Sequence, residues 1–239
     1  YRYDFGWEQT HLGLLEEFSQ ARREYCQKVS NWELAYCWYW DDWESDPYQR
    51  EFDAAIAKWH EFPSDSIGEL IRLSELGSVL ALFWAGCGYA YGHGTKKDED
   101  AAAIFFQKPI DAGCWSAALE HAKLLGRKGE WDECFYLLED GVAKNVPPFY
   151  YWLARHLQRR GAAHSENWRI DRLLARAGKA GDPRALIARS KFRIKGKLGW
   201  RRIPSGFRLF KQQLTRELEA AELHDQAQTS EASKTNEPS

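Results

Sequence analysis

The chain has 239 residues, a formal net charge of −2, 28% charged residues and 15% aromatic residues. No apolar run is long enough to form a membrane-spanning helix, and alternating β-branched runs are few, which disfavours both a membrane protein and a sheet protein. No signal peptide is visible. We therefore expect a cytoplasmic location, or a periplasmic one if a leader has been removed.

Residues 1–46 predict a helical N-terminal cap. Aromatic residues recur there at helical spacing: Trp32, Tyr36, Trp40 and Trp43. The first unit of a repeat array needs a cover for its open face, which favours a cap over an aromatic platform for a sugar or peptide. Asp41 and Asp42 beside Trp43 leave open a carbohydrate-active enzyme.

Residues 47–77 predict a first pair of helices. Its first helix would carry Ala54, Ala55, Ala57 and Trp59, and its second helix Leu70, Leu73 and Leu76.

Residues 77–113 give the strongest signal, a helix, a glycine turn and a second helix between two glycines 36 residues apart. Small residues on the first helix allow a neighbouring helix to approach closely: Ala81, Ala85, Gly86 and Gly88. Gly92 and Gly94 tolerate positive φ in the turn, and Asp98 is placed to cap the second helix. Pro109 predicts a kink or an early end of that helix.

This unit resembles the Sel-one-like repeats, which are related to the tetratricopeptide repeats. The matching positions are Ala81, Gly86, Tyr89, Gly92, Gly94, Asp98, Ala102, Phe106 and Gly113. The resemblance implies an all-α, right-handed superhelical α-solenoid of about four to five helix-turn-helix repeats. It also implies an adaptor rather than an enzyme, with the first helices lining a concave groove.

Weaker copies follow in phase. A shorter unit runs from Gly113, a unit from Asn145 to Gly181 restores the 36-residue spacing, and a fourth unit begins at Gly181. Its turn is expected to extend from Lys197 to Gly206. We therefore predict a cap over residues 1–46, a repeat solenoid over 47–216, and an acidic helix end with a flexible tail over 217–239.

Charge is segregated along the chain. Residues 1–149 hold 14 Lys/Arg and 26 Asp/Glu, residues 150–216 hold 18 and 3, and residues 217–239 hold 1 and 6. Because a solenoid lays its sequence along one axis, these counts predict a rod with an acidic start and a basic end.

The phase of the repeats places Tyr151 and Arg155 in register with Ile187 and Lys191 on first helices. The predicted binding residues are Tyr151, Arg155, Arg159, Arg184, Lys191 and Lys195. Their charge favours a protein partner with an acidic surface or segment. Nucleic acid or an anionic polysaccharide is the alternative, because aromatic residues are interleaved with the lysines and arginines. Head-to-tail self-association and a plain solvated face also stay open.

No pattern for a cofactor, a metal or a catalytic nucleophile appears. The five cysteines lack CxxC spacing, which predicts buried thiols in a reducing compartment. His60, His121, His156 and His164 are scattered, and no phosphate-binding glycine loop is present. We therefore expect no cofactor, no metal and no catalytic residues.

Overall fold

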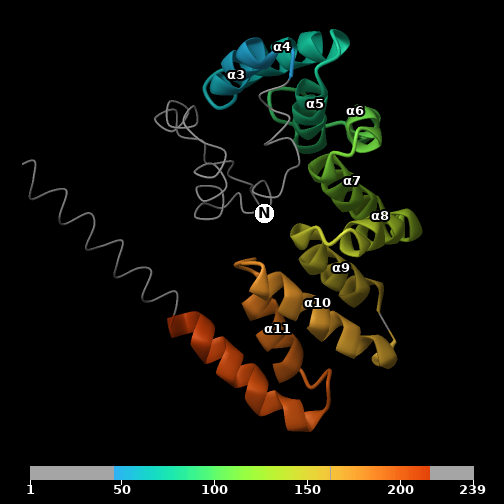
Figure 1. Cartoon of the computed structure of the whole chain (residues 1–239), viewed down its shortest axis with the longest axis vertical. Helices are drawn as coiled ribbons and strands as arrows, with labels where there is room; N and C mark the ends of the chain where they lie inside the picture. The colour runs from blue at the N-terminus through green and yellow to red at the C-terminus, as the bar shows by residue number, and fades with distance from the viewer. Residues whose placement is uncertain (1–45, 162, 216–239) are drawn as a thin grey trace, which may run out of the picture. The chain divides into compact units, whose positions relative to one another are not determined.

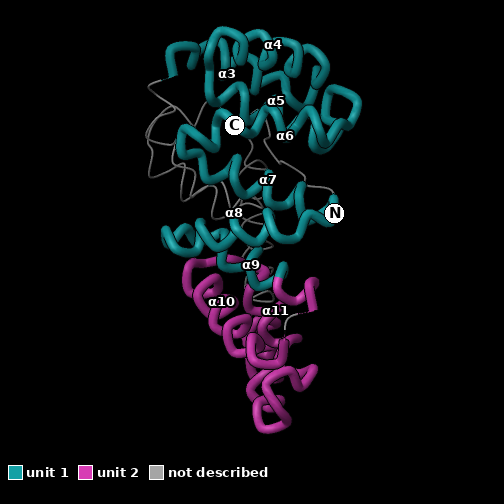
Figure 2. Tube along the Cα trace, turned by 90° about the vertical axis from the view of Figure 1, so that its right-hand side faces the viewer, with its two compact units in different colours: residues 1–156 teal, residues 157–239 magenta. Residues whose placement is uncertain are grey.

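The computed structural model describes residues 46–161 and 163–215 (Figure 1). Every regular element within these ranges is a helix, which confirms an α-solenoid of helical repeats. The predicted cap, except for Asp46, and the predicted tail lie outside the described residues, as do Asp41 and Asp42. The chain divides into two compact units, residues 1–156 and 157–239 (Figure 2).

The helices follow one another as pairs. In the first unit α3 (Gln49–Ala57) pairs with α4 (Pro63–Glu75), α5 (Val79–Tyr91) with α6 (Glu99–Asp111), and α7 (Trp115–Lys128) with α8 (Trp131–Ala143). Helix α9 (Pro147–Arg160) contains the boundary between the units. In the second unit α10 (Asn167–Lys179) follows the end of α9, and α11 (Ala185–Ile194) precedes a last helix over residues 203–215.

The predicted repeat phase is confirmed by the backbone. Positive φ values follow each second helix at the positions where the repeat restarts: Gly77 (106°), Gly113 (90°), Asn145 (60°) and Gly181 (97°). A left-handed residue lets the chain leave one helix and enter the next without steric strain. The 36-residue period is therefore a period of helix ends.

The local predictions for the 77–113 unit also hold. Gly92 and Gly94 have φ values of 71° and 70°, and the Asp98 carboxylate accepts hydrogen bonds from the backbone N–H groups of Asp100 and Ala101. A Cβ atom on Gly86 would lie 2.6 Å from Cε1 of the fully buried Phe106. The absence of a side chain at Gly86 therefore permits the close packing of α5 on α6.

Four sequence details differ from the structure. Trp59 lies just beyond the end of α3 and Leu76 forms the C-cap of α4, so neither is inside its predicted helix. Pro109 does not end α6, because proline in the last turn removes only one backbone hydrogen bond and the helix continues to Asp111. The last helix begins at residue 203, because the 3-10 turn Trp200–Arg202 leads directly into it.

The buried thiols are confirmed for Cys87, Cys114 and Cys134, while Cys26 and Cys37 lie outside the described residues. Cys114 also caps α7, because its sulfur accepts a hydrogen bond from the N–H of Ala117 at 3.4 Å. The thiol of Cys134 lies 3.2 Å from Nδ1 of the buried His156, which joins α8 to α9.

His121 on α7 is buried, and its Nδ1 atom has no hydrogen-bond partner. Burial lowers the pKa of this imidazole below its usual value of about 6.5. The unfolded chain therefore binds a proton at His121 more readily than the folded chain, and the free energy of unfolding decreases as the pH falls below about 6.5. We expect His121→Leu to unfold at a higher urea concentration than the native protein at pH 5, and the gain to shrink at pH 7. An equal gain at both pH values would contradict this origin.

Candidate functional site

The predicted binding residues fall in both compact units. In the first unit Tyr151 and Arg155 lie one turn apart on α9, and both are half-buried. The Tyr151 ring meets that of Trp152 edge to face at 5.7 Å. Because they are four residues apart, Tyr151 and Arg155 occupy neighbouring positions on one face of this first helix.

In the second unit three of the predicted bases are exposed. Arg159 lies in the last turn of α9, Lys191 on α11, and Lys195 at the C-cap of α11. Arg184, at the N-cap of α11, instead forms two hydrogen bonds with the buried Asp182, at 3.0 Å from Nε and 2.8 Å from Nη2. Arg184 therefore fixes the turn before α11.

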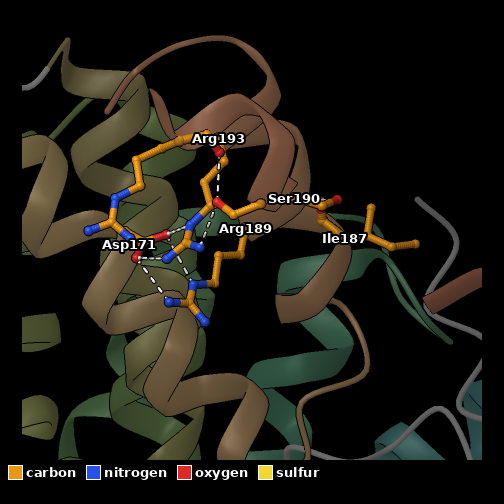
Figure 3. A network of polar contacts seen from close by, with 7 residues as sticks. Asp171, Ile187, Arg189, Ser190 and Arg193 are labelled. Atoms are coloured by element: carbon orange, nitrogen blue, oxygen red, sulfur yellow. Dashed lines mark hydrogen bonds and ion pairs between the residues drawn. The ribbon is translucent and has the colours of Figure 1, made fainter. Parts of the chain in front are cut away.

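A buried carboxylate organises the seam between α10 and α11. Asp171 on α10 accepts two hydrogen bonds from Arg193, both at 2.7 Å, and two from Arg189, both at 3.0 Å (Figure 3). Arg193 also donates to the Ser205 hydroxyl at 3.1 Å, which reaches the last helix. The network thus ties three consecutive helices together.

The charge state of Asp171 follows from these partners. Burial alone would raise the pKa of its carboxyl group, but the hydrogen bonds and positive charges of Arg193 and Arg189 outweigh burial and hold the pKa below its usual range. Asp171 is therefore ionised at neutral pH, and it neutralises part of the positive charge on α11.

The acidic residues between positions 157 and 215 all form hydrogen bonds within that stretch. Residues 157–215 contain sixteen Lys and Arg but only Glu166, Asp171 and Asp182 as acids. Asp171 and Asp182 are 5% and 3% exposed and pair with arginines, and Glu166 accepts a hydrogen bond from the Ala163 N–H. The outer surface of residues 157–215 consequently carries an excess of positive charge with little acid from the same stretch beside it.

A second polar cluster joins the first helices of the first unit. Tyr91 of α5 donates a hydrogen bond to Glu120 of α7, and Glu120 pairs with Lys123 at 2.5 Å. The Lys123 ammonium lies 4.8 Å from the ring centroid of Trp152 on α9. Burial, with the nearby Glu120 charge, raises the pKa of Tyr91. These contacts hold α5, α7 and α9 in a fixed order along one side of the repeats.

The aromatic residues interleaved with the lysines and arginines differ in how far they are buried. Tyr150 and Phe192 are buried and belong to the packing between helices, each 6% exposed. Trp168, Trp200 and Phe207 are 49%, 75% and 57% exposed. The Arg202 guanidinium lies 5.2 Å from the Trp168 ring, and that of Arg201 lies 5.4 Å from the Trp200 ring. Only the exposed group can contact a partner directly.

Sequence reasoning missed the Asp171 network and the Lys123 cluster. Asp171 stood out in one respect, because it is one of only three acids in a strongly basic stretch. A lone acid between an apolar pair at helical spacing, here Ile170 and Leu174, indicates a buried ion pair. Nothing in the sequence distinguishes Arg189 and Arg193 from the other arginines nearby.

Within residues 46–161 and 163–215, no group of three or more His, Cys, Asp or Glu side chains could hold a metal ion. No helix in that same part of the chain has the length and the apolar character needed to cross a bilayer.

Comparison with known proteins places the fold. No family model matches the chain, and no curated protein matches it. A solved structure of a protective antigen present in uropathogenic Escherichia coli strains, displaying an SLR fold, aligns with a TM-score of 0.56 at 14% identity. The alignment covers 84% of this chain and 47% of that protein, so this chain spans about half the antigen's length.

A Sel1 repeat protein from Oxalobacter formigenes aligns with a TM-score of 0.55 at 13% identity, covering 80% of this chain and 83% of that protein. Structural similarity at 13–14% sequence identity indicates a shared fold and nothing about function. Together with the repeat phase and the helix pairs, it confirms the resemblance noted in the sequence: the chain has the fold of the Sel1-like repeat proteins.

Proposed function

We propose that the protein is a non-catalytic scaffold that binds an acidic segment of a partner protein through its basic first helices. The observation that carries this proposal is the pairing of Asp171 and Asp182 with nearby arginines, which leaves the exposed Arg159, Lys191 and Lys195 with few acids beside them between residues 157 and 215. A surface of one sign attracts the opposite sign and raises the rate of encounter. The predicted residues Lys191, Lys195 and Arg159 are exposed and suited to this role.

The stacked helix pairs support a scaffold. Repeat folds of this kind use extended surfaces for binding, and their rigid helix pairs hold side chains in fixed register. The Lys123 cluster fixes α5, α7 and α9, so a ligand on these helices would meet a preorganised surface.

The test is a charge reversal. A partner would first be captured from a lysate of the native organism at low and high salt and then purified. We expect the Arg155→Glu, Lys191→Glu double variant to bind this partner roughly tenfold more weakly, because attraction becomes repulsion. Isothermal calorimetry would measure the affinity. Lys108→Glu, at an exposed lysine on α6, serves as the control and should leave the affinity unchanged.

Unchanged affinity in the double variant would remove the first-helix assignment. A polyanion is the second candidate, favoured by the exposed Trp168 and Trp200 with arginines over their rings, since bases stack on such surfaces. Nucleic acid retained at low salt, with a steep loss of affinity as salt rises, would support that candidate and replace the protein partner.

A further inference from the structure

The last described helix, residues 203–215, exposes an apolar side. Phe207, Phe210 and Leu214 are 57%, 36% and 44% exposed, and their spacing places them on one face. The adjoining face packs on α11, where a Cβ atom on Gly206 would lie 2.9 Å from Cβ of Arg193 and from the backbone nitrogen of Ile194. The exposed stripe therefore borders the face of the helix that packs on α11.

The register of the repeats shows how the equivalent positions are covered in the preceding helix pairs. Phe210 is in register with Phe106, Leu138 and Leu174 of the three preceding second helices. Those side chains are 0%, 2% and 0% exposed. Phe106 packs between two first helices, since its ring meets Gly86 of α5 and lies 6.3 Å from that of His121 on α7. The other second helices also contact the first helix of the following pair: α10 packs on α11, and Gly141 of α8 lies against Phe149 of α9.

The residues in register with Phe207 also contact the first helix of the following pair. It corresponds to Phe135 on α8 and to Asp171 on α10. The Phe135 ring lies 6.0 Å from that of His156 on the next first helix, and Asp171 binds two arginines of the next first helix. This position thus contacts the incoming helix in the two preceding pairs, and no described helix follows residue 215 to meet Phe207.

The surroundings of the open face are basic. Arg208 and Lys211 flank it on the same helix, and Arg201 and Arg202 precede it, all of them exposed. A terminal repeat that ends the array would instead need a polar outer face. An apolar stripe with cations beside it suits a helix that carries acids beside its own apolar stripe.

We propose that the face formed by Phe207, Phe210 and Leu214 binds an amphipathic α-helix of a partner protein, with acidic residues beside its apolar stripe, in the position that a next first helix would take. This surface is distinct from the first-helix residues Arg155 and Lys191, and it does not depend on them. Two copies of the face cannot pair well with each other, because their flanking cations would repel.

The test uses the full chain and a defined probe, a fluorescein-labelled helical peptide of about 20 residues built from Leu, Ala and Glu, with Leu on one stripe and Glu beside it. Fluorescence anisotropy measures its affinity. We expect Phe207→Ser with Phe210→Ser to weaken binding roughly tenfold or more. Both side chains are exposed, so the variant should keep the native circular dichroism spectrum. Tyr136→Ser on α8, which removes another exposed ring, should bind as the native chain does.

A peptide with Lys in place of Glu should also bind roughly tenfold more weakly. Equal binding by the double serine variant, or equal binding of the Lys peptide, would overturn the proposal. The charge-reversed Arg155→Glu, Lys191→Glu chain should keep its affinity for the peptide, which separates this surface from the first-helix surface. Sedimentation velocity of the protein alone provides the remaining check: association of native copies that the double serine variant abolishes would make a second copy the occupant and overturn the assignment to a partner.

Discussion

Asp171→Ala is expected to lower the free energy of unfolding by about 3–4 kcal/mol, because it leaves the guanidinium of Arg193 buried without its counter-charge. Arg193 is only 9% exposed and forms both of its shortest hydrogen bonds with this carboxylate. Urea unfolding followed by circular dichroism at neutral pH would measure the loss.

The matched control is Asp140→Ala on α8. Asp140 pairs with Lys144 at 3.0 Å, but both side chains are about half exposed, so the loss should stay within about 0.5 kcal/mol. A loss at Asp171 as small as that at Asp140 would show that Arg193 finds solvent or another partner when the carboxylate is removed.

The same network predicts a dependence on pH. The folded-state pKa of Asp171 lies below its unfolded value, so its stabilisation is fully present above about pH 3.9 and is lost as the pH falls through the lower folded value. The stability difference between the native chain and Asp171→Asn should therefore shrink between pH 7 and pH 3.

The second large effect concerns two helical glycines with opposite expected signs. A Cβ atom on Gly141 would lie 2.2 Å from the ring of Phe149, which is fully buried. Gly141→Ala should therefore lower the free energy of unfolding by about 2 kcal/mol, because the ring cannot move aside in a packed interior.

Gly126 on α7 provides the contrast. Its added Cβ atom would lie 3.5 Å from the Cys134 sulfur, an ordinary contact, and alanine favours a helix over glycine by about 1 kcal/mol. Gly126→Ala should raise the urea midpoint while Gly141→Ala lowers it. A raised midpoint in both variants would mean that helix propensity, and not the close contact with Phe149 of α9, decides the outcome at Gly141.

The features that the sequence predicts well are local ones. Gly77, Gly113 and Gly181 mark helix ends because left-handed backbone favours glycine at each of them, and Asn145 takes the same role. Asp98 caps α6 through its immediate neighbours in the chain. Backbone conformation and capping depend on a few adjacent residues, so a single sequence is enough to predict them.

The features that it predicts poorly depend on distant partners. Whether an arginine faces solvent, as Arg159 does, or a buried carboxylate, as Arg193 does, depends on what the neighbouring helix presents. The pairing of Arg184, a predicted binding residue, with Asp182 was not foreseen. The sequence predicts Gly206 at the end of a turn, but it lies inside the last helix. A glycine is needed there because α11 passes close to its Cα atom.

The unequal lengths of two turns have a practical consequence for attaching probes to this molecule. Residues 92–98 separate α5 from α6, whereas only residues 129–130 separate α7 from α8. The longer turn is anchored at its start, where His93 contacts the Trp59 carbonyl at 2.6 Å, but Lys96 and Lys97 are exposed. Since lengthening an exposed loop adds little closure entropy, an epitope tag or a fluorophore-bearing insert belongs between these two lysines and not in the second, tightly closed turn.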